Sequence, residues 1–285
     1  MQPFAYVRPA TLSEALTLLD EHGPDASLLA GGTDLVVALR NRTLRPKVVI
    51  DLKRVAELRP SISDEEGWTT INATSVLTDI SEDQRIRARY PALVDAAVTV
   101  GSAQIRNRAT LTGNICHASP AADTAPALLV YGAIANVASV RGTSRVNLAE
   151  FFVGPRQTVL QPGELVTSIA LPADATPRGA TFVRITRRRG VDLATISLCC
   201  MVEATGRTQF AFGAVGPRPF LVADESGLLA DLDVGDAAKD EVLRRLLTQA
   251  SPISDVRGSR EYREAMLLVM SRRALRLSIA RLAAA

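Results

Sequence analysis

The sequence predicts an α+β protein with more than one domain. Three observations support this prediction: strands and helices alternate over the first fifty-odd residues, a meander of strands follows residue 177, and two helices finish the chain. With 285 residues the chain is long enough for two domains, and the 47% of apolar residues supply a sizeable core.

Residues 4–52 form a strand–helix–strand–helix–strand pattern. Strands are expected at 4–10, 26–30 and 47–52, the second of them buried, and helices at 11–23 and 35–41. The first helix is well signalled, because Thr11 and Glu14 make a capping box and Gly23 ends the helix. This part of the chain is therefore a small α/β unit.

The middle of the chain has a different pattern of predicted strands and helices. We expect strands at 68–73, 134–140 and 164–171, and helices over 74–83, 90–100 and 123–133. The proline and glycine content of residues 172–179 favours a domain boundary there.

The last part of the chain is predicted as a three-stranded meander followed by two helices. The strands are expected at 180–186, 194–204 and 208–215, and the helices at about 237–249 and 259–283. The second helix is strongly amphipathic, and its arginines are candidates to face solvent or a partner: Arg263, Arg272, Arg273, Arg276 and Arg281.

Composition excludes several classes of protein. A net charge of +3 offers no electrostatic case for nucleic-acid binding, and three cysteines without CxxC spacing indicate a reduced, cytoplasmic protein. No signal peptide and no apolar run long enough for a membrane span is present, so a soluble protein is expected. Two histidines provide too few ligands for a metal site, and no hydrolase motif occurs.

The first candidate site lies between a strand and a helix, in the stretch LLAGGTDL. It comprises Leu28, Leu29, Ala30, Gly31, Gly32, Thr33, Asp34 and Leu35. Two glycines allow a sharp turn and a close approach to a ligand, and the following amides would suit a phosphate. The alternative is an ordinary turn capped by Thr33 or Asp34. Neither common nucleotide fingerprint, GxGxxG or GxxxxGKS, is present.

The second candidate site is in residues 107–123, which lack the period of a helix or a strand and look like backbone laid against something other than protein. A turn is expected at Thr110, Leu111, Thr112, Gly113 and Asn114. Asp123 would accept from ribose hydroxyls or an adenine amino group. The alternative is a surface loop capped by Ser119 and Asp123. Two such turns suit the pyrophosphate of a dinucleotide.

A third feature is the arginine cluster of residues 184–189, just before Asp192. Such a cluster is most often a solvated or salt-bridged face, but it would also supply cations near an electron-rich ring or an anion.

Five motifs in order resemble the FAD-binding medium subunit of molybdenum hydroxylases, such as carbon monoxide, xanthine and nicotine dehydrogenases. They are AGGTDL, IRNRATLTGNICHASPAAD, GELVTSIALP, RRRGVDLATI and SPISDVRGSREYR. The resemblance implies a p-cresol methylhydroxylase/vanillyl-alcohol-oxidase-type FAD-binding domain at 1–175, with subdomains at about 1–56 and 57–175. It further implies a C-terminal domain at 176–285, made of a three-stranded antiparallel sheet and helices.

The resemblance also assigns roles to residues. It implies that 28–35 and 110–114 hold the FAD pyrophosphate and that Asp123 holds its ribose or adenine end. Val100, Gly101 and Val166 would line the cofactor, and Arg184 would stand where many members have a lysine near the flavin ring. In one departure from the family pattern, Thr112 replaces a glycine of the usual TxGGN motif.

The function implied by the resemblance is electron transfer through non-covalent FAD. An iron–sulfur small subunit would reduce the FAD after a molybdenum-cofactor large subunit oxidises substrate, with NAD, oxygen or a quinone as acceptor and a dimer of heterotrimers as the assembly. The alternatives are a self-sufficient flavin oxidase or dehydrogenase and a non-catalytic assembly module.

Overall fold

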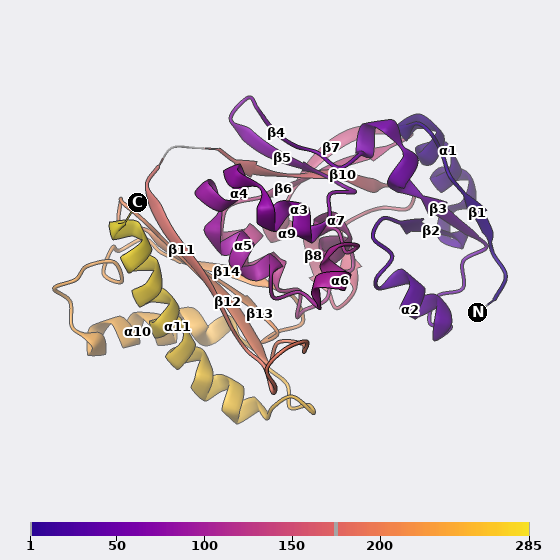
Figure 1. Cartoon of the computed structure of the whole chain (residues 1–285). Coiled ribbons are helices and arrows are strands. Elements are labelled where there is room, and N and C mark those ends of the chain that lie inside the picture. The colour runs from indigo at the N-terminus through magenta and orange to yellow at the C-terminus, as the bar shows by residue number, and fades with distance from the viewer. Residues whose placement is uncertain (1, 174–175, 285) are drawn as a thin grey trace.

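The computed structural model describes residues 2–173 and 176–284, and it contains three main sheets (Figure 1). The expected α+β class is confirmed. Part of the predicted domain boundary, residues 174–175, lies outside the described residues. Among the described residues no helix is both long and apolar enough to cross a membrane.

The N-terminal unit is a parallel three-stranded sheet in the order β1-β3-β2, with two helices. Its strands are β1 (Ala5–Val7), β2 (Ala26–Leu29) and β3 (Val48–Asp51), and its α-helices are α1 (Leu12–His22) and α2 (Leu35–Arg40). The Thr11 hydroxyl caps α1 by accepting from the Glu14 amide at 3.2 Å, as predicted. The expected buried strand β2 is only half-buried.

The middle unit is an antiparallel five-stranded sheet in the order β4-β5-β10-β6-β7. Its strands are β4 (Ile62–Glu65), β5 (Trp68–Asn72), β6 (Ile134–Ser139), β7 (Gly142–Asn147) and β10 (Leu165–Pro172). The strands β4 and β7 were not predicted, because β4 is half exposed and β7 is mostly exposed at the edges of the sheet, and neither shows a clear apolar pattern.

Helices of the middle unit connect these strands. They are α3 (Leu77–Glu82), α4 (Gln84–Arg89), α5 (Pro91–Ala97), α6 (Ala103–Arg106), α7 (Leu111–Cys116), α8 (Thr124–Val130) and α9 (Leu148–Phe151), and the short strands β8 (Phe152–Gly154) and β9 (Gln157–Thr158) pair beside α9.

The C-terminal unit is an antiparallel sheet of four strands rather than the three expected. The strands are β11 (Arg178–Ile185), β12 (Ile196–Glu203), β13 (Thr208–Gly213) and β14 (Phe220–Asp224). The prediction omitted β14 because this short strand follows a proline-rich turn and is only partly buried. The helices α10 (Asp236–Leu246) and α11 (Arg260–Ala283) complete the unit.

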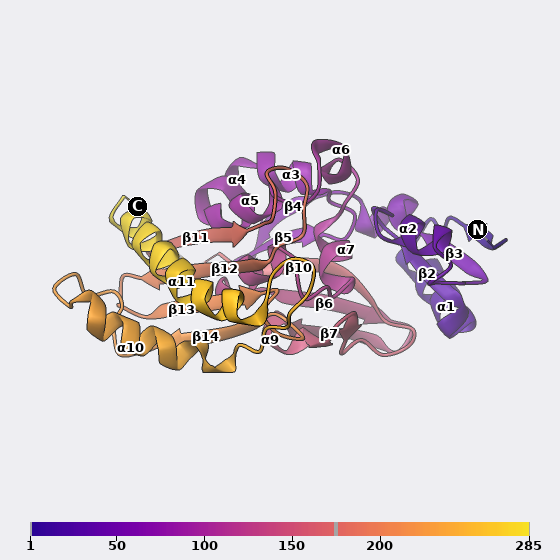
Figure 2. The ribbon, with the colours of Figure 1, turned by 90° about the horizontal axis from the view of Figure 1, so that it is seen from below.

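The four-stranded sheet lies between two layers of helices (Figures 1 and 2). The helix α11 packs on β11 and β12 from one side, whereas α5 and α8 pack on β11, β12 and β13 from the other. Side chains along β12 alternate accordingly: Cys199 and Met201 join the core of the middle unit, and Cys200 and Val202 join the core beneath α11. The middle and C-terminal units thus share one core.

Candidate functional site

The first predicted segment is pressed against the second at Gly31. A β-carbon on Gly31 would lie 2.1 Å from the carbonyl oxygen of Arg108 and 3.0 Å from the Cα of Ala109. Only glycine permits this backbone contact. The loop after β2 and the chain leading into α7 therefore meet.

The loop from Gly31 to Asp34 leaves its backbone donors available. Gly32 has φ +79°, a conformation that favours glycine, and none of the hydrogen bonds in the described part of the chain uses the amides of residues 31–34. Asp34 stands at the N-cap of α2 but its side chain makes no capping hydrogen bond. The alternative of a turn capped by Asp34 is thus not what the structure contains.

The second segment is a helix and not the predicted turn. Residues 111–116 form α7, and the Thr110 hydroxyl caps it by accepting from the Gly113 amide at 3.0 Å. Because the backbone amide of Gly113 makes this bond, it is not available to donate to a ligand. The helix escaped prediction because six residues do not establish a period.

The run 107–123 also packs protein, contrary to the expectation that it faces only a ligand. Its apolar residues enter the main core: Ala109, Leu111, Ile115, Ala118 and Ala122. The side chain of Asn114 is engaged as well, because its Oδ1 accepts from the hydroxyl of Thr124 at 2.7 Å and ties α7 to α8.

Two buried polar atoms in this run lack hydrogen-bond partners in the described structure. They are the hydroxyl oxygen of Thr112 and Oδ1 of Asp123. The Thr99 hydroxyl, which lies near Asp123, donates to the carbonyl oxygen of Ala96 at 2.7 Å. Buried polar groups are rarely left unpaired, so both atoms are available for hydrogen bonds to a polar ligand.

Asp123 and Arg184 form a buried ion pair between the middle and C-terminal units. The Nη1 of Arg184, on β11, donates to Oδ2 of Asp123 at 2.6 Å, and the two side chains are only 14% and 8% exposed. Burial raises the pKa of Asp123 to about 6, although Arg184 acts in the opposite direction. Asp123 was predicted to hold the ribose or adenine end of FAD and Arg184 to lie near the flavin ring, and the structure shows that these two side chains contact each other.

The remaining predicted residues lie on neighbouring elements. Gly101 has φ +54° just before α6, where the side chain of Arg106 donates to the carbonyl oxygens of Val100 and Gly101 at 3.2 and 3.3 Å. Val166 is buried in β10, the strand on which α7 packs. Leu28 and Leu29 are half-buried at the end of β2, and Leu35 begins α2.

Sequence reasoning missed two contributors to this region. The backbone of Arg108 and Ala109 forms the surface that Gly31 meets, and Lys53 donates to the carbonyl oxygen of Ala30 at 3.4 Å while pairing with Asp51 at 2.6 Å. Lys53 sits two residues beyond β3, next to β2 in the sheet, so a parallel pairing of these strands was the signal that could have found it.

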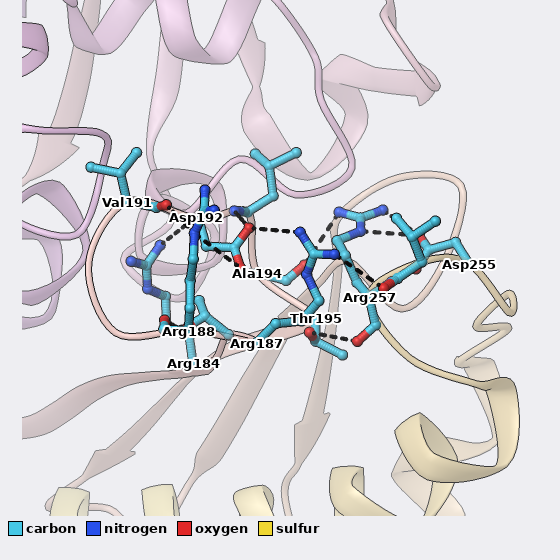
Figure 3. Close-up of polar contacts among 12 residues, drawn as sticks. Arg184, Arg187, Arg188, Val191, Asp192, Ala194, Thr195, Asp255 and Arg257 are labelled. Atoms are coloured by element: carbon cyan, nitrogen blue, oxygen red, sulfur yellow. Dashed lines mark hydrogen bonds and ion pairs between the residues drawn. The ribbon is translucent and has the colours of Figure 1, made fainter.

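The arginine cluster is largely salt-bridged, as one of its two interpretations predicted. Arg187 and Arg188 approach Asp192 at 3.4 and 3.9 Å, and Arg188 also donates to the carbonyl oxygen of Val191 at 3.0 Å (Figure 3). Arg184 differs from them, because it turns to Asp123.

Two family models match this chain and together span most of it. Residues 2–174 match the FAD binding domain in molybdopterin dehydrogenase, and residues 181–278 match the CO dehydrogenase flavoprotein C-terminal domain. The fold thus belongs to a class of FAD-binding proteins.

Named relatives agree with these matches, and the similarity extends over nearly the whole of both chains. The chain is 31% identical to the carbon monoxide dehydrogenase medium chain of Hydrogenophaga pseudoflava, with 98% of both chains covered. It is 29% identical to the xanthine dehydrogenase FAD-binding subunit of Escherichia coli O157:H7, covering 97% of this chain and 96% of the relative. A chain of the reconstituted CO dehydrogenase from Oligotropha carboxidovorans superposes with a TM-score of 0.91 at 27% identity, covering 98% and 99%.

The chain therefore belongs to the family of FAD-binding subunits of molybdopterin-dependent dehydrogenases. It is an oxidoreductase subunit with FAD as its cofactor, and it serves electron transfer in a multi-subunit enzyme, as the resemblance implied.

Proposed function

We propose that FAD lies where the loop 28–35 meets the start of α7. The observation that carries the proposal is the contact of Gly31 with the Arg108 carbonyl, which unites the two segments expected to hold a pyrophosphate. The amides of residues 31–34, free of hydrogen bonds in the described chain, supply donors to phosphate oxygens. Leu111 and Thr112 supply the second set of donors in place of Gly113.

The polar and apolar residues around this junction complete the proposed site. The Oδ1 of Asp123, without a hydrogen-bond partner in the described structure, accepts from a ribose hydroxyl or an adenine amino group. Val100, Gly101 and Val166 line the cofactor, and Arg184 places a fixed cation near it. When bound, FAD supplies the redox chemistry, and the chain's share is to bind and orient it.

We further propose the setting in which this subunit acts. An iron–sulfur subunit delivers electrons to the FAD, a molybdenum-cofactor subunit oxidises the substrate, and NAD, oxygen or a quinone accepts the electrons from a dimer of heterotrimers in the cytoplasm. The names of the relatives, medium chain and FAD-binding subunit, support the multi-subunit setting. We also propose domains at 1–175 and 176–285, in keeping with separate sheets.

The test is to purify the chain with the subunits that accompany it and to record the visible spectrum. We expect a flavin spectrum and flavin that is released by acid precipitation, because no covalent link is proposed. A colourless preparation that also refuses added FAD would contradict the proposal, and flavin retained in the acid precipitate would contradict its non-covalent part.

A further inference from the structure

Arg263 is an arginine of α11 that the sequence analysis placed toward solvent or a partner, and the structure buries it. Its side chain is 1% exposed. Nη1 donates to the carbonyl oxygens of Thr195 and Ala214 at 3.0 and 2.7 Å, and Nη2 donates to Oδ1 of Asp255 at 2.6 Å. A buried ion pair often adds little net stability. The groups that Arg263 holds in place are therefore a better guide to its role than the stability it contributes.

Asp255 and Arg257 extend this cluster to a third carbonyl group. The backbone amide, Nε and Nη2 of Arg257 all donate to Asp255, at 2.8, 3.0 and 2.6 Å, and its Nη1 donates to the carbonyl oxygen of Ala194 at 3.3 Å (Figure 3). Two guanidinium groups oriented by one carboxylate thus hold the carbonyl groups of residues 194, 195 and 214.

Two of these residues, Ala194 and Ala214, touch the run that contains Asp123. Ala194 and Ala214 form a small buried cluster with Ala121, and the amide of Ala214 donates to the carbonyl oxygen of Pro120 at 2.7 Å. Ala214 has φ +63°, an unusual conformation for alanine that the surrounding contacts must maintain. The cluster around Arg263 is therefore connected to the residues just before Asp123.

The loop between β11 and β12, which contains Ala194 and Thr195, also contacts Arg184. Residues 186–195 connect β11 to β12, and the amide of Thr195 closes this loop by donating to the carbonyl oxygen of Ile185 at 2.8 Å. Arg184 donates to the carbonyl oxygen of Asp192 at 3.5 Å, while Arg187 donates to that of Val256 at 3.2 Å. Both members of the Asp123–Arg184 pair are thus supported by the segments that Arg263 and Arg257 hold.

We propose that Arg263, oriented by Asp255 and Arg257, is a positioning residue that fixes the Asp123–Arg184 pair against the cofactor. This inference rests on the proposed function, because it assumes that FAD lies at that pair. Arg263 touches neither Asp123 nor the cofactor site directly in the described contacts, and it acts through the backbone of residues 194, 195 and 214.

The test compares Arg263→Lys with Arg272→Lys in the protein purified with its accompanying subunits. Arg272 is the control, because it lies on the same helix and is paired with Asp240 instead of the cluster around Asp255, although its side chain is more exposed, at 38%. Lysine keeps the charge in both variants but loses the planar fork that reaches several acceptors. We expect R263K to bind FAD roughly 2- to 30-fold more weakly. The visible circular dichroism and the reduction potential of the bound flavin shift in R263K and stay at wild-type values in R272K.

The outcomes separate the inference from the proposed function. If the wild-type protein binds no FAD, the proposed function fails. If the wild-type protein binds FAD and Asp123→Asn changes the flavin spectrum while R263K leaves the spectrum, potential and affinity unchanged, the inference alone is overturned. Should R263K not fold, Arg257→Lys replaces it, since that side chain is 22% exposed, and an unchanged flavin in R257K also overturns the inference.

Discussion

The fold shifts the pKa of Asp123, and this shift makes the stability of the protein depend on pH. Burial raises the pKa of Asp123 from 3.8 to about 6. A carboxyl group that binds its proton more tightly in the folded state contributes stability below the unfolded-state pKa, and this contribution is lost as the pH rises through the folded-state pKa. Between about pH 4 and pH 6 the folded protein therefore loses stability because of this group.

The pH prediction is tested with Asp123→Asn in the absence of added FAD. Asparagine does not titrate, so the wild-type protein should lose about 1–3 kcal/mol of unfolding free energy relative to D123N between pH 4 and pH 6. Urea unfolding at several pH values measures the difference. A difference that stays constant over this range would contradict the raised pKa.

Gly31 is the residue on which the junction of the two segments depends. In Gly31→Ala the new methyl group would lie 2.1 Å from the Arg108 carbonyl oxygen, so the loop and the chain before α7 must separate. We expect a loss of about 1–3 kcal/mol in stability and a marked loss of FAD affinity, measured by thermal unfolding and flavin titration.

The control for Gly31 is Gly216, where the nearest atoms to an added β-carbon lie at 3.5 Å or more. Gly216→Ala should leave both measurements near the wild-type values. Equal FAD affinity in G31A and G216A would show that the contact with Arg108 does not shape the site.

At the scale of elements, the packing of α11 on β11 depends on Gly179. A β-carbon there would stand 2.0 Å from the carbonyl oxygen of Ser278 and 2.4 Å from the amide nitrogen of Leu282. Gly179→Ala should therefore push the helix away from the strand and lower the free energy of unfolding by about 1–3 kcal/mol. Gly216→Ala is again the control, because the nearest atom to its added β-carbon lies at 3.5 Å. Similar denaturant midpoints for both variants would refute this packing argument.

Elements were predictable where burial and local signals coincide. The helix α1 has a cap and an apolar face, and β12 contains the apolar run of residues 198–202, so both were found. The helix α7 is short, and β7 is mostly exposed, so neither has a readable period. Arg263 was misplaced because an arginine on an amphipathic helix normally faces water, whereas here carbonyl groups from distant strands and Asp255 receive it.

At the scale of the whole molecule, the shared core has a thermodynamic consequence. Ala180, Phe182, Cys199 and Met201 of the C-terminal sheet pack in one cluster with residues of the middle unit, and Arg281 of α11 pairs with Asp95 of α5 at 2.6 Å. We expect these two units to unfold together as one calorimetric transition whose van't Hoff and calorimetric enthalpies agree. Two resolved transitions assigned to these units would contradict the coupling.

The sequence by itself determined the class of fold and the family, and it singled out the two segments that we propose hold FAD, because glycine spacing, caps and apolar periods are local properties of the chain. Only the tertiary structure decided that Gly31 meets Arg108, that buried atoms of Thr112 and Asp123 lack hydrogen-bond partners among the described residues, and that Arg184 turns to Asp123. These are contacts between segments tens of residues apart, and they exist only once the strands and helices pack together.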